Sequence, residues 1–236
     1  SWASRRSTSR RTVSSKLTRA ATRVMASTAR SLIDKGSRIP PYGVFCPGDP
    51  AEAARLVEQD GLVSASGEGI LGGRAVAGAV AAAMGGASVP DVVLAALSVI
   101  PADSWTARNI VRVREVLGGS PPTSGDPGPL VEALHAAVVV RHYPWTDIAP
   151  EAVALALAAF LAGDGDVEAA VTFGVSLGRD ADTIGAIAGA IAGARQGEGG
   201  VPGRWAARIE PVTGKCLPVV AGRHVLDVAD ELAEGL

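Results

Sequence analysis

Apolar residues recur at intervals of three and four along most of the chain, which is the spacing of one face of an α-helix. The alternation of apolar and polar residues that is typical of a half-buried strand never extends beyond a few positions. We therefore predict an all-α fold. Helices are expected near residues 50–59, 72–84, 90–99, 104–117, 129–141, 150–162, 166–177, 182–195 and 224–234.

Two regions outside these helices also carry structural signals. Residues 17–25 place apolar side chains at helical spacing, so a further helix is expected there. The following segment, 36–50, contains four prolines and no sustained periodicity, and it predicts a long structured loop. That loop should end at Asp49 as the N-cap of the next helix, with Pro50 in the first turn. The stretch 118–129, with four prolines and four glycines, predicts a flexible connector.

The composition indicates how such helices would pack. The 236 residues are 47% hydrophobic but only 4% aromatic, and 29 are glycine, so we expect one compact domain whose helices approach closely. No apolar run without charges reaches the roughly 18 residues that a membrane span requires. Cys46 and Cys216 have no spacing typical of a disulfide framework or a zinc site. Unpaired thiols are typical of a reducing compartment, and we expect a cytoplasmic protein.

Charge divides the chain into two parts. Residues 1–40 hold ten Lys or Arg against one acid, Asp34, whereas the remainder holds 12 basic and 23 acidic residues. We predict a basic, Ser/Arg-rich extension over 1–35 that leads into a helix, and a helical domain over 36–236. The extension has three interpretations: a solvated tail, a transit peptide or a nucleic-acid-binding arm. Because the domain is acidic, nucleic acid is not an expected partner.

The strongest chemical signal is the sequence GRDADT at 178–183, which runs directly into IGAIAGAIAGA. At the entry to a helix, Asp180 and Asp182 can both face one cation, and Thr183 adds a neutral oxygen. Ligation by oxygen alone suits Mg²⁺ or Mn²⁺. The alternative is that Asp180 caps the helix and Asp182 interacts with its dipole. Glycines at every fourth position from Gly185 predict a deeply buried helix, which favours the cation.

This signature resembles that of the ADP-ribosylglycohydrolases, a Gly-x-Asp-x-Asp-Thr segment followed by Ile-Gly and a helix of small residues. Further stretches are similar to family segments and occur in the same order. They are SRIPPYGVFCPGDP, DGLVSASGEGILGG, IPADSW, APEAVALALAAF and VPGRW. The resemblance covers about residues 36–236.

The resemblance implies an all-α enzyme that holds a pair of Mg²⁺ or Mn²⁺ ions and hydrolyses N- or O-glycosidic bonds of ADP-ribose. The substrate would be an ADP-ribosyl group on a protein or a small molecule. By this likeness, Asp180, Asp182 and Thr183 are metal ligands. The residues implied to line the ADP-ribose cleft are Ser37, Arg38, Glu68, Gly69, Gly178 and Arg179. The implied chemistry is metal-assisted attack of water on C1 of the ribose, and no residue is assigned as a catalytic acid or base.

The sequence departs from the family pattern in three ways. The family's N-terminal segment resembling Thr-Asp-Asp-Thr supplies further metal ligands, but here Asp34 is the only acid before Asp49. Ala65 stands where the family has a histidine, and Ser37 stands where a methionine precedes the loop arginine. Two functions therefore follow from the resemblance. One is a hydrolase impaired by the missing ligands, and the other is a noncatalytic or truncated relative with a binding or structural role.

Three charged residues have open roles. The carboxylates of Glu68 and Glu151 are candidate substitutes for the missing ligands, but no spacing argument places either near Asp180. Because Glu151 directly follows Pro150, it is most simply an acid in the first turn of a helix. Arg179 either binds a phosphate or neutralises the acids beside it.

Overall fold

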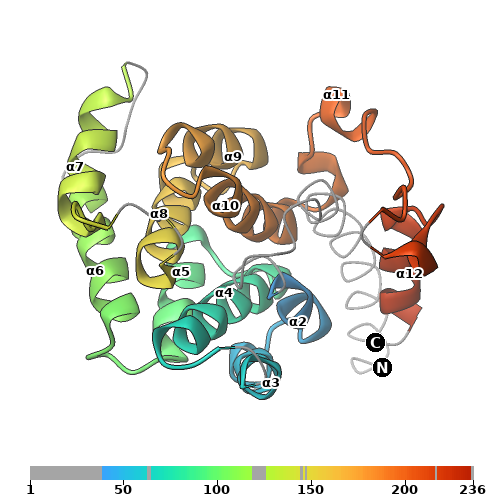
Figure 1. Cartoon of the computed structure of the whole chain (residues 1–236), viewed down its shortest axis with the longest axis horizontal. Coiled ribbons are helices and arrows are strands. Elements are labelled where there is room, and N and C mark those ends of the chain that lie inside the picture. Colours follow the sequence, from blue (N-terminus) through green and yellow to red (C-terminus); the bar gives the residue numbers. More distant parts are fainter. Residues whose placement is uncertain are drawn as a thin grey trace, which may run out of the picture.

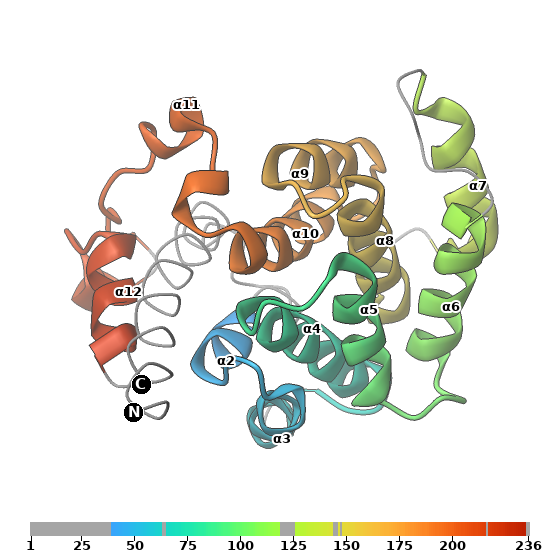
Figure 2. The ribbon, with the colours of Figure 1, turned by 180° about the vertical axis from the view of Figure 1, so that it is seen from behind.

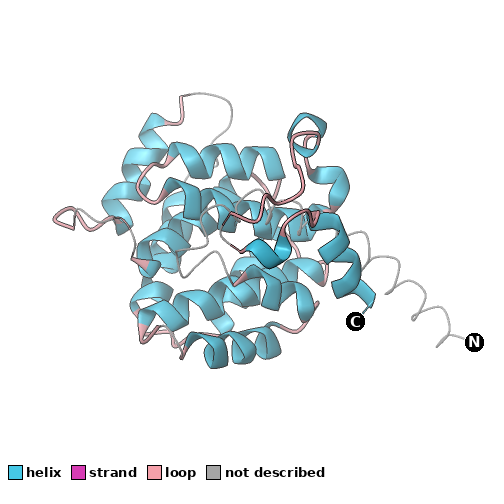
Figure 3. Ribbon diagram, turned by 45° about the vertical axis from the view of Figure 1, so that its right-hand side comes forward, coloured by secondary structure: helices cyan, strands magenta, loops and turns pink. Residues whose placement is uncertain are grey.

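A computed structural model describes residues 39–62, 65–118, 126–143, 146, 148–215 and 217–234. Within these ranges the regular elements are helices and there is no strand, so the all-α prediction is confirmed (Figure 3). The α-helices are α2 (Pro40–Phe45), α3 (Pro50–Gly61), α4 (Glu68–Met84), α5 (Val89–Ser98), α6 (Trp105–Gly118), α7 (Gly128–Val138), α8 (Ala149–Ala162), α9 (Val167–Ser176), α10 (Ala181–Gln196), α11 (Gly203–Ala206) and α12 (Val225–Glu234).

Several predicted features lie outside the described residues. They include the helix at 17–25, the basic extension over 1–35, and the residues Ser37 and Arg38 of the expected cleft. Most of the connector at 118–129 also falls outside. These features stay predictions.

Side-chain caps explain where three of the predicted helices begin. Oδ1 of Asp49 accepts a hydrogen bond of 3.0 Å from the backbone N–H of Glu52, and Pro50 opens α3. Ser88 caps α5 and Asp166 caps α9 in the same way. Each cap satisfies an N–H that has no partner within its helix. The predicted N-cap at Asp49 is therefore confirmed.

The prediction of a loop throughout 36–50 is wrong, because α2 forms within it. The two prolines that open α2 need no N–H at the first helical turn, and they preset the helical backbone angle. Gly43 then lets α2 lie directly on α4. A Cβ at Gly43 would come within 2.6 Å of both the Ala77 carbonyl oxygen and Val80 Cβ. Close packing against α4, which apolar periodicity does not report, stabilises this helix.

Two boundaries also differ from the predicted ones. α4 begins at Glu68 rather than near residue 72, because the chain reverses at Gly67, where φ is +52°. α7 ends at Val138 rather than near residue 141.

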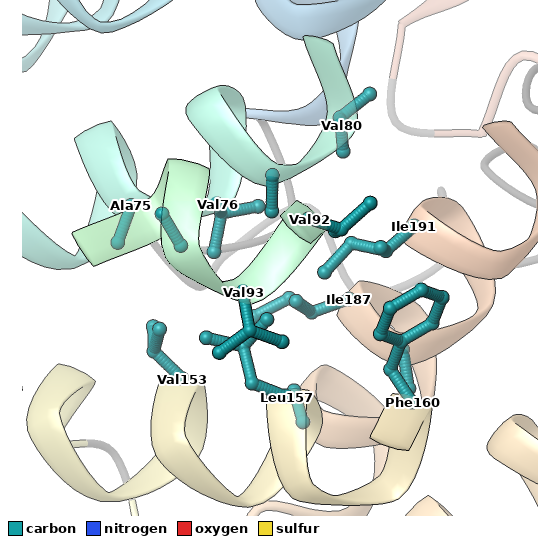
Figure 4. Close-up of a cluster of buried hydrophobic side chains, with 14 of the residues drawn as sticks. Ala75, Val76, Val80, Val92, Val93, Val153, Leu157, Phe160, Ile187 and Ile191 are labelled. Atoms are coloured by element: carbon teal, nitrogen blue, oxygen red, sulfur yellow. The ribbon is translucent and has the colours of Figure 1, made fainter. Parts of the chain in front are cut away.

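Helices α4, α8 and α10 form the centre of the molecule and are buried along nearly their whole length (Figures 1 and 2). α10 packs against α4, α8 and α9, while α5 and α6 each contact both α4 and α8. Medium-sized apolar side chains meet between these helices (Figure 4): Val76, Val80, Val92, Val93, Val153, Leu157, Phe160, Ile187 and Ile191. Alanine and glycine fill most other buried positions, so the predicted core of small side chains is confirmed.

Glycines set the distance between α9 and α10. A Cβ on Gly174 would lie 3.4 Å from the Gly185 Cα, and a Cβ on Gly185 would lie 2.9 Å from Cγ2 of Val175. Gly185, Gly189 and Gly193 are all buried, which confirms the prediction of a deeply buried helix.

The remaining helices cover the periphery. α7 packs against α6 and α8 at one end of the molecule, and α11 and α12 lie at the opposite end (Figure 1). None of the described helices combines the length and the apolar character needed to cross a bilayer.

Candidate functional site

The α10 turn, which we define as residues 177–183, places the predicted metal ligands at the N-terminus of α10. Asp180 is the N-cap residue, and Asp182 lies in the first helical turn. The Asp180 side chain makes no capping hydrogen bond, so the expectation that it caps the helix is wrong, whereas the interaction of Asp182 with the helix dipole stays a prediction. Thr183 is only 4% exposed, and its Oγ1 has no hydrogen-bond partner among the described residues. A buried hydroxyl without a partner is costly, and it therefore marks Thr183 as a candidate ligand.

The backbone of the α10 turn is left-handed at two consecutive residues. Gly178 has φ of +66° and Arg179 has φ of +56°. This region suits glycine but strains a residue with a Cβ, at a cost of about 1–3 kcal/mol. The surrounding structure must therefore hold Arg179 in place.

An ion pair between Arg179 and Glu151 helps to keep Arg179 in this conformation. The Arg179 Nε donates to Glu151 Oε1 at 2.5 Å, and a terminal nitrogen of its guanidinium donates to Oε2 at 3.2 Å. The same terminal nitrogen lies 3.3 Å from the Tyr143 carbonyl oxygen. Glu151 also accepts from the backbone N–H of Val140 at 3.1 Å. The Glu151 side chain is 1% exposed and that of Arg179 is 19% exposed, so the pair is largely shielded from water.

Further hydrogen bonds fix the elements around this pair. A ring nitrogen of His135, on α7, lies 2.7 Å from the Leu177 carbonyl oxygen at the start of the α10 turn. The side-chain amide of Asn109, on α6, donates to the Pro150 carbonyl oxygen at 3.1 Å. The first turn of α8 is thus tied to α6, and the α10 turn is tied to both α7 and α8.

Glu68 joins the start of α4 to the start of α6. Its carboxylate accepts from the backbone N–H groups of Trp105 at 2.7 Å and Thr106 at 2.9 Å, and from the Thr106 hydroxyl at 2.7 Å. Partial burial raises the pKa of the Glu68 carboxyl, but these hydrogen bonds outweigh burial, so its pKa lies below the ordinary value. The structure thus gives Glu68 a capping role at α6, with Gly69 beside it in α4.

The structure therefore gathers part of the predicted site. Gly178 and Arg179 directly precede Asp180, Asp182 and Thr183, as the sequence requires. Glu68 instead binds the start of α6, and α6 in turn contacts the first turn of α8, which holds the Glu151 partner of Arg179.

The donor set of the α10 turn fits a hard divalent cation. Two carboxylates and a hydroxyl offer only oxygen ligands, as Mg²⁺ and Mn²⁺ prefer, and the orphaned Thr183 hydroxyl suits a ligand position. Among the described residues, no three His, Cys, Asp or Glu side chains lie close enough together to hold a metal. The α10 turn by itself thus offers only part of a ligand set, and the metal site stays a prediction.

A sequence model of the ADP-ribosylglycohydrolases matches residues 2–236. The chain belongs to the ADP-ribosylglycohydrolase family. The match begins well before residue 36, so it includes the basic segment as well as the motifs described above.

A solved structure also resembles this chain in its fold. A solved structure titled "ADP-ribosylglycohydrolase-related protein complex" is similar to 84% of this chain at 24% identity, with a TM-score of 0.51. That likeness supports the fold, and this chain covers 57% of the other chain. No curated protein matches the sequence.

The sequence did not reveal how closely Glu151 is tied to the α10 turn. It is the one acidic residue within an otherwise apolar helix, APEAVALALAAFLA. A single acid in such a helix was the available signal that Glu151 has a specific partner. The partner, Arg179, is 28 residues away, and no helical or strand spacing connects the two. The pairing follows from the packing of α8 against α10.

Proposed function

We propose that this protein hydrolyses ADP-ribosyl glycosidic bonds with the aid of Mg²⁺ or Mn²⁺. The observation that carries the proposal is the buried Oγ1 of Thr183, which has no hydrogen-bond partner in the described part of the chain and follows Asp180 and Asp182 at the N-terminus of α10. Family membership supports the reaction class. The substrate would be an ADP-ribosyl group attached to a protein or a small molecule.

In this proposal each residue of the α10 turn has a separate task. Asp180, Asp182 and Thr183 would hold the cation, as part of a dinuclear site in the intact family fold. A cation bound there would polarise water and orient ribose hydroxyls. Gly178 and Arg179 would form the adjoining wall of the ADP-ribose cleft, their backbone fixed by the contacts of the Arg179 side chain.

A noncatalytic role is the second candidate, and two observations favour it. The guanidinium of Arg179 is engaged by Glu151, and the carboxylate of Glu68 is engaged by α6. Both groups were expected to face the substrate, yet both have internal partners. In this alternative the protein binds ADP-ribose without turning it over.

Release of ADP-ribose from arginine-linked and serine-linked ADP-ribosyl peptides, with and without millimolar Mn²⁺, separates these functions. The wild-type protein should release ADP-ribose only with Mn²⁺. Asp180→Ala together with Asp182→Ala should lower the rate by at least about 100-fold. Glu115→Gln, which removes an exposed carboxylate on α6, is the matched control and should leave the rate unchanged.

Calorimetric titration with ADP-ribose completes the test. Binding without turnover on either peptide would establish the noncatalytic alternative. Turnover that survives the double aspartate substitution would overturn the assignment of the α10 turn.

A further inference from the structure

We propose that Glu151 is a positioning residue for the metal-binding carboxylates, and that it acts through Arg179. This inference rests on the proposed function, because it assigns a task to a residue that supports the same α10 turn. Glu151 lies on α8 and touches neither Asp180 nor Asp182 in any hydrogen bond described above. It instead sets the conformation of the residue that directly precedes Asp180.

The burial of Glu151 is the first argument. Of the described residues, Glu151 is the only charged one that is fully buried, and the other residues of α8 are Ala, Pro, Val, Leu and Phe. A buried ion pair generally adds no stability over apolar side chains of similar volume, because removing both charges from water offsets their attraction. An apolar residue would serve the packing of α8 equally well. The presence of a carboxylate at this buried position is therefore best explained by its partner Arg179, which it orients.

The geometry of the contact is the second argument. Both Glu151 oxygens accept from the Arg179 guanidinium, and Oε2 also accepts from the Val140 N–H. The planar guanidinium donates in parallel to a carboxylate, so this arrangement fixes direction as well as distance. The guanidinium is further tied to the Tyr143 carbonyl. Arg179 therefore cannot rotate without losing contacts to two segments.

The strained backbone is the third argument. With φ of +56°, Arg179 occupies a conformation that a residue with a Cβ leaves unless it is held. The chain on either side is fixed, because the Leu177 carbonyl contacts His135 and the Asp180 carbonyl accepts from the Ile184 N–H at 2.9 Å. Release of Arg179 would therefore turn the peptide that leads into Asp180. The directions of the Asp180 and Asp182 carboxylates would change with it.

Electron paramagnetic resonance of Mn²⁺ bound to the full chain tests this inference, because the spectrum reports affinity and ligand symmetry without any turnover. Glu151→Gln keeps the size of the side chain but removes its charge. It should raise the Kd for Mn²⁺ by about tenfold and broaden the signal of the bound ion. The matched control is Glu58→Gln, which removes the acid of the Arg74–Glu58 pair between α3 and α4. The control should leave both readouts unchanged.

Arg179→Gly supplies a second, independent variant, since glycine adopts the left-handed conformation without strain. In the Arg179→Gly background, adding Glu151→Gln should change the Mn²⁺ Kd less than twofold, because the residue through which Glu151 acts is gone. Thermal unfolding of every variant is recorded in parallel. If Glu151→Gln fails to fold, Arg179→Gly and Arg179→Ala are compared instead. Alanine should then raise the Mn²⁺ Kd more than glycine does.

Three outcomes contradict the inference. A lower unfolding temperature with an unchanged Mn²⁺ Kd for Glu151→Gln would show a purely structural role, and the proposed function would stand. Equal Mn²⁺ Kd values for Arg179→Gly and Arg179→Ala would show that the left-handed backbone at Arg179 does not affect metal binding. A wild-type protein that binds no Mn²⁺ would overturn both this inference and the proposed function.

Discussion

The middle of the central helices and their N-terminal ends are built in different ways. Between α4, α8 and α10 the buried side chains are almost all apolar, and glycine or alanine permits close contact. At the ends, by contrast, buried polar groups gather. Glu151 and Thr183 lie in the first turns of α8 and α10, and Thr106 and Asn109 of the neighbouring α6 contact the first turns of α4 and α8. Thr106 and Asn109 form hydrogen bonds to helices that are distant in sequence, and Glu151 pairs with Arg179 of the α10 turn.

This difference separates two kinds of constraint. The middle of each helix depends on volume and shape, so many apolar sequences would satisfy it. The ends depend on pairing, so removing one partner leaves a buried group unsatisfied. The candidate site lies at the ends, where the sequence has less freedom.

Truncation of the central aromatic side chain should have the largest effect on stability. Phe160 is fully buried, and Phe160→Ala should lower the free energy of unfolding by about 4 kcal/mol, since a cavity remains in a close-packed core. Urea unfolding measures the loss. Leu94→Ala, at a position 46% exposed on α5, is the control and should cost less than about 0.5 kcal/mol. A similar loss from both variants would show that Phe160 is not tightly packed.

The next largest effect is expected where α2 touches α4. Gly43→Ala should cost about 1–3 kcal/mol, because the new Cβ meets the backbone of Ala77, which cannot move aside. Thermal unfolding of the variant measures it. If alanine instead stabilises the protein, α2 does not lie on α4 as the structure has it.

The ends of the helices should respond to pH in a way that the middle does not. Glu68 has a pKa below its ordinary value in the folded protein, so its ionised form stabilises the fold. That contribution is present above the unfolded-state pKa of about 4.3 and is lost as the pH falls through the lower, folded-state pKa.

Glu68→Gln should therefore cost about 1 kcal/mol at pH 7, and the gap to the wild type should narrow below about pH 4. Urea unfolding at pH 7, 5 and 3.5 measures this change, with Glu115→Gln as the exposed control. If the difference in unfolding free energy between the wild type and Glu68→Gln were the same at all three pH values, the Glu68 charge would not cap α6.

The smallest expected effect concerns the residue beside Glu68. Among the described residues, a Cβ at Gly69 would meet only the Cβ of Ala65, at 3.6 Å, so Gly69→Ala should stabilise α4 by about 0.5–1 kcal/mol. The unfolding temperature of Gly69→Ala is compared with that of Gly43→Ala, because the first position has room for a Cβ and the second does not. If Gly69 lines the ADP-ribose cleft, the same variant should bind ADP-ribose more weakly while it unfolds at a higher temperature. Destabilisation by Gly69→Ala would contradict the open space around it.

The sequence predicted the parts of the fold that are encoded locally. Helix α10 was expected over 182–195 and extends over Ala181–Gln196, because its glycine and isoleucine pattern is strong and continuous. The N-cap at Asp49 was likewise encoded within four residues. In contrast, α2 escaped prediction because its stability comes from contact with α4.

The candidate site was predictable only where its residues are consecutive. The motif of Asp180, Asp182 and Thr183 was recognised as one unit, and the structure adds the orphaned Thr183 hydroxyl. The pairing of Glu151 with Arg179 depends on how α8 packs beside the α10 turn, which no spacing in the sequence specifies. The roles of the cleft residues stay predictions, including those of Ser37 and Arg38.

The abundance of alanine and glycine in the central helices also affects how much motion folding must remove. These residues have no rotamers to restrict, whereas each buried Leu or Ile loses about 0.5–1 kcal/mol of side-chain conformational entropy. Folding therefore orders the interiors of α4, α8 and α10 with little such loss. In these helices, the buried side chains that have rotamers to exchange are the larger ones, such as Leu157 and Ile187. The α10 turn is consequently attached to a support that has few internal degrees of freedom.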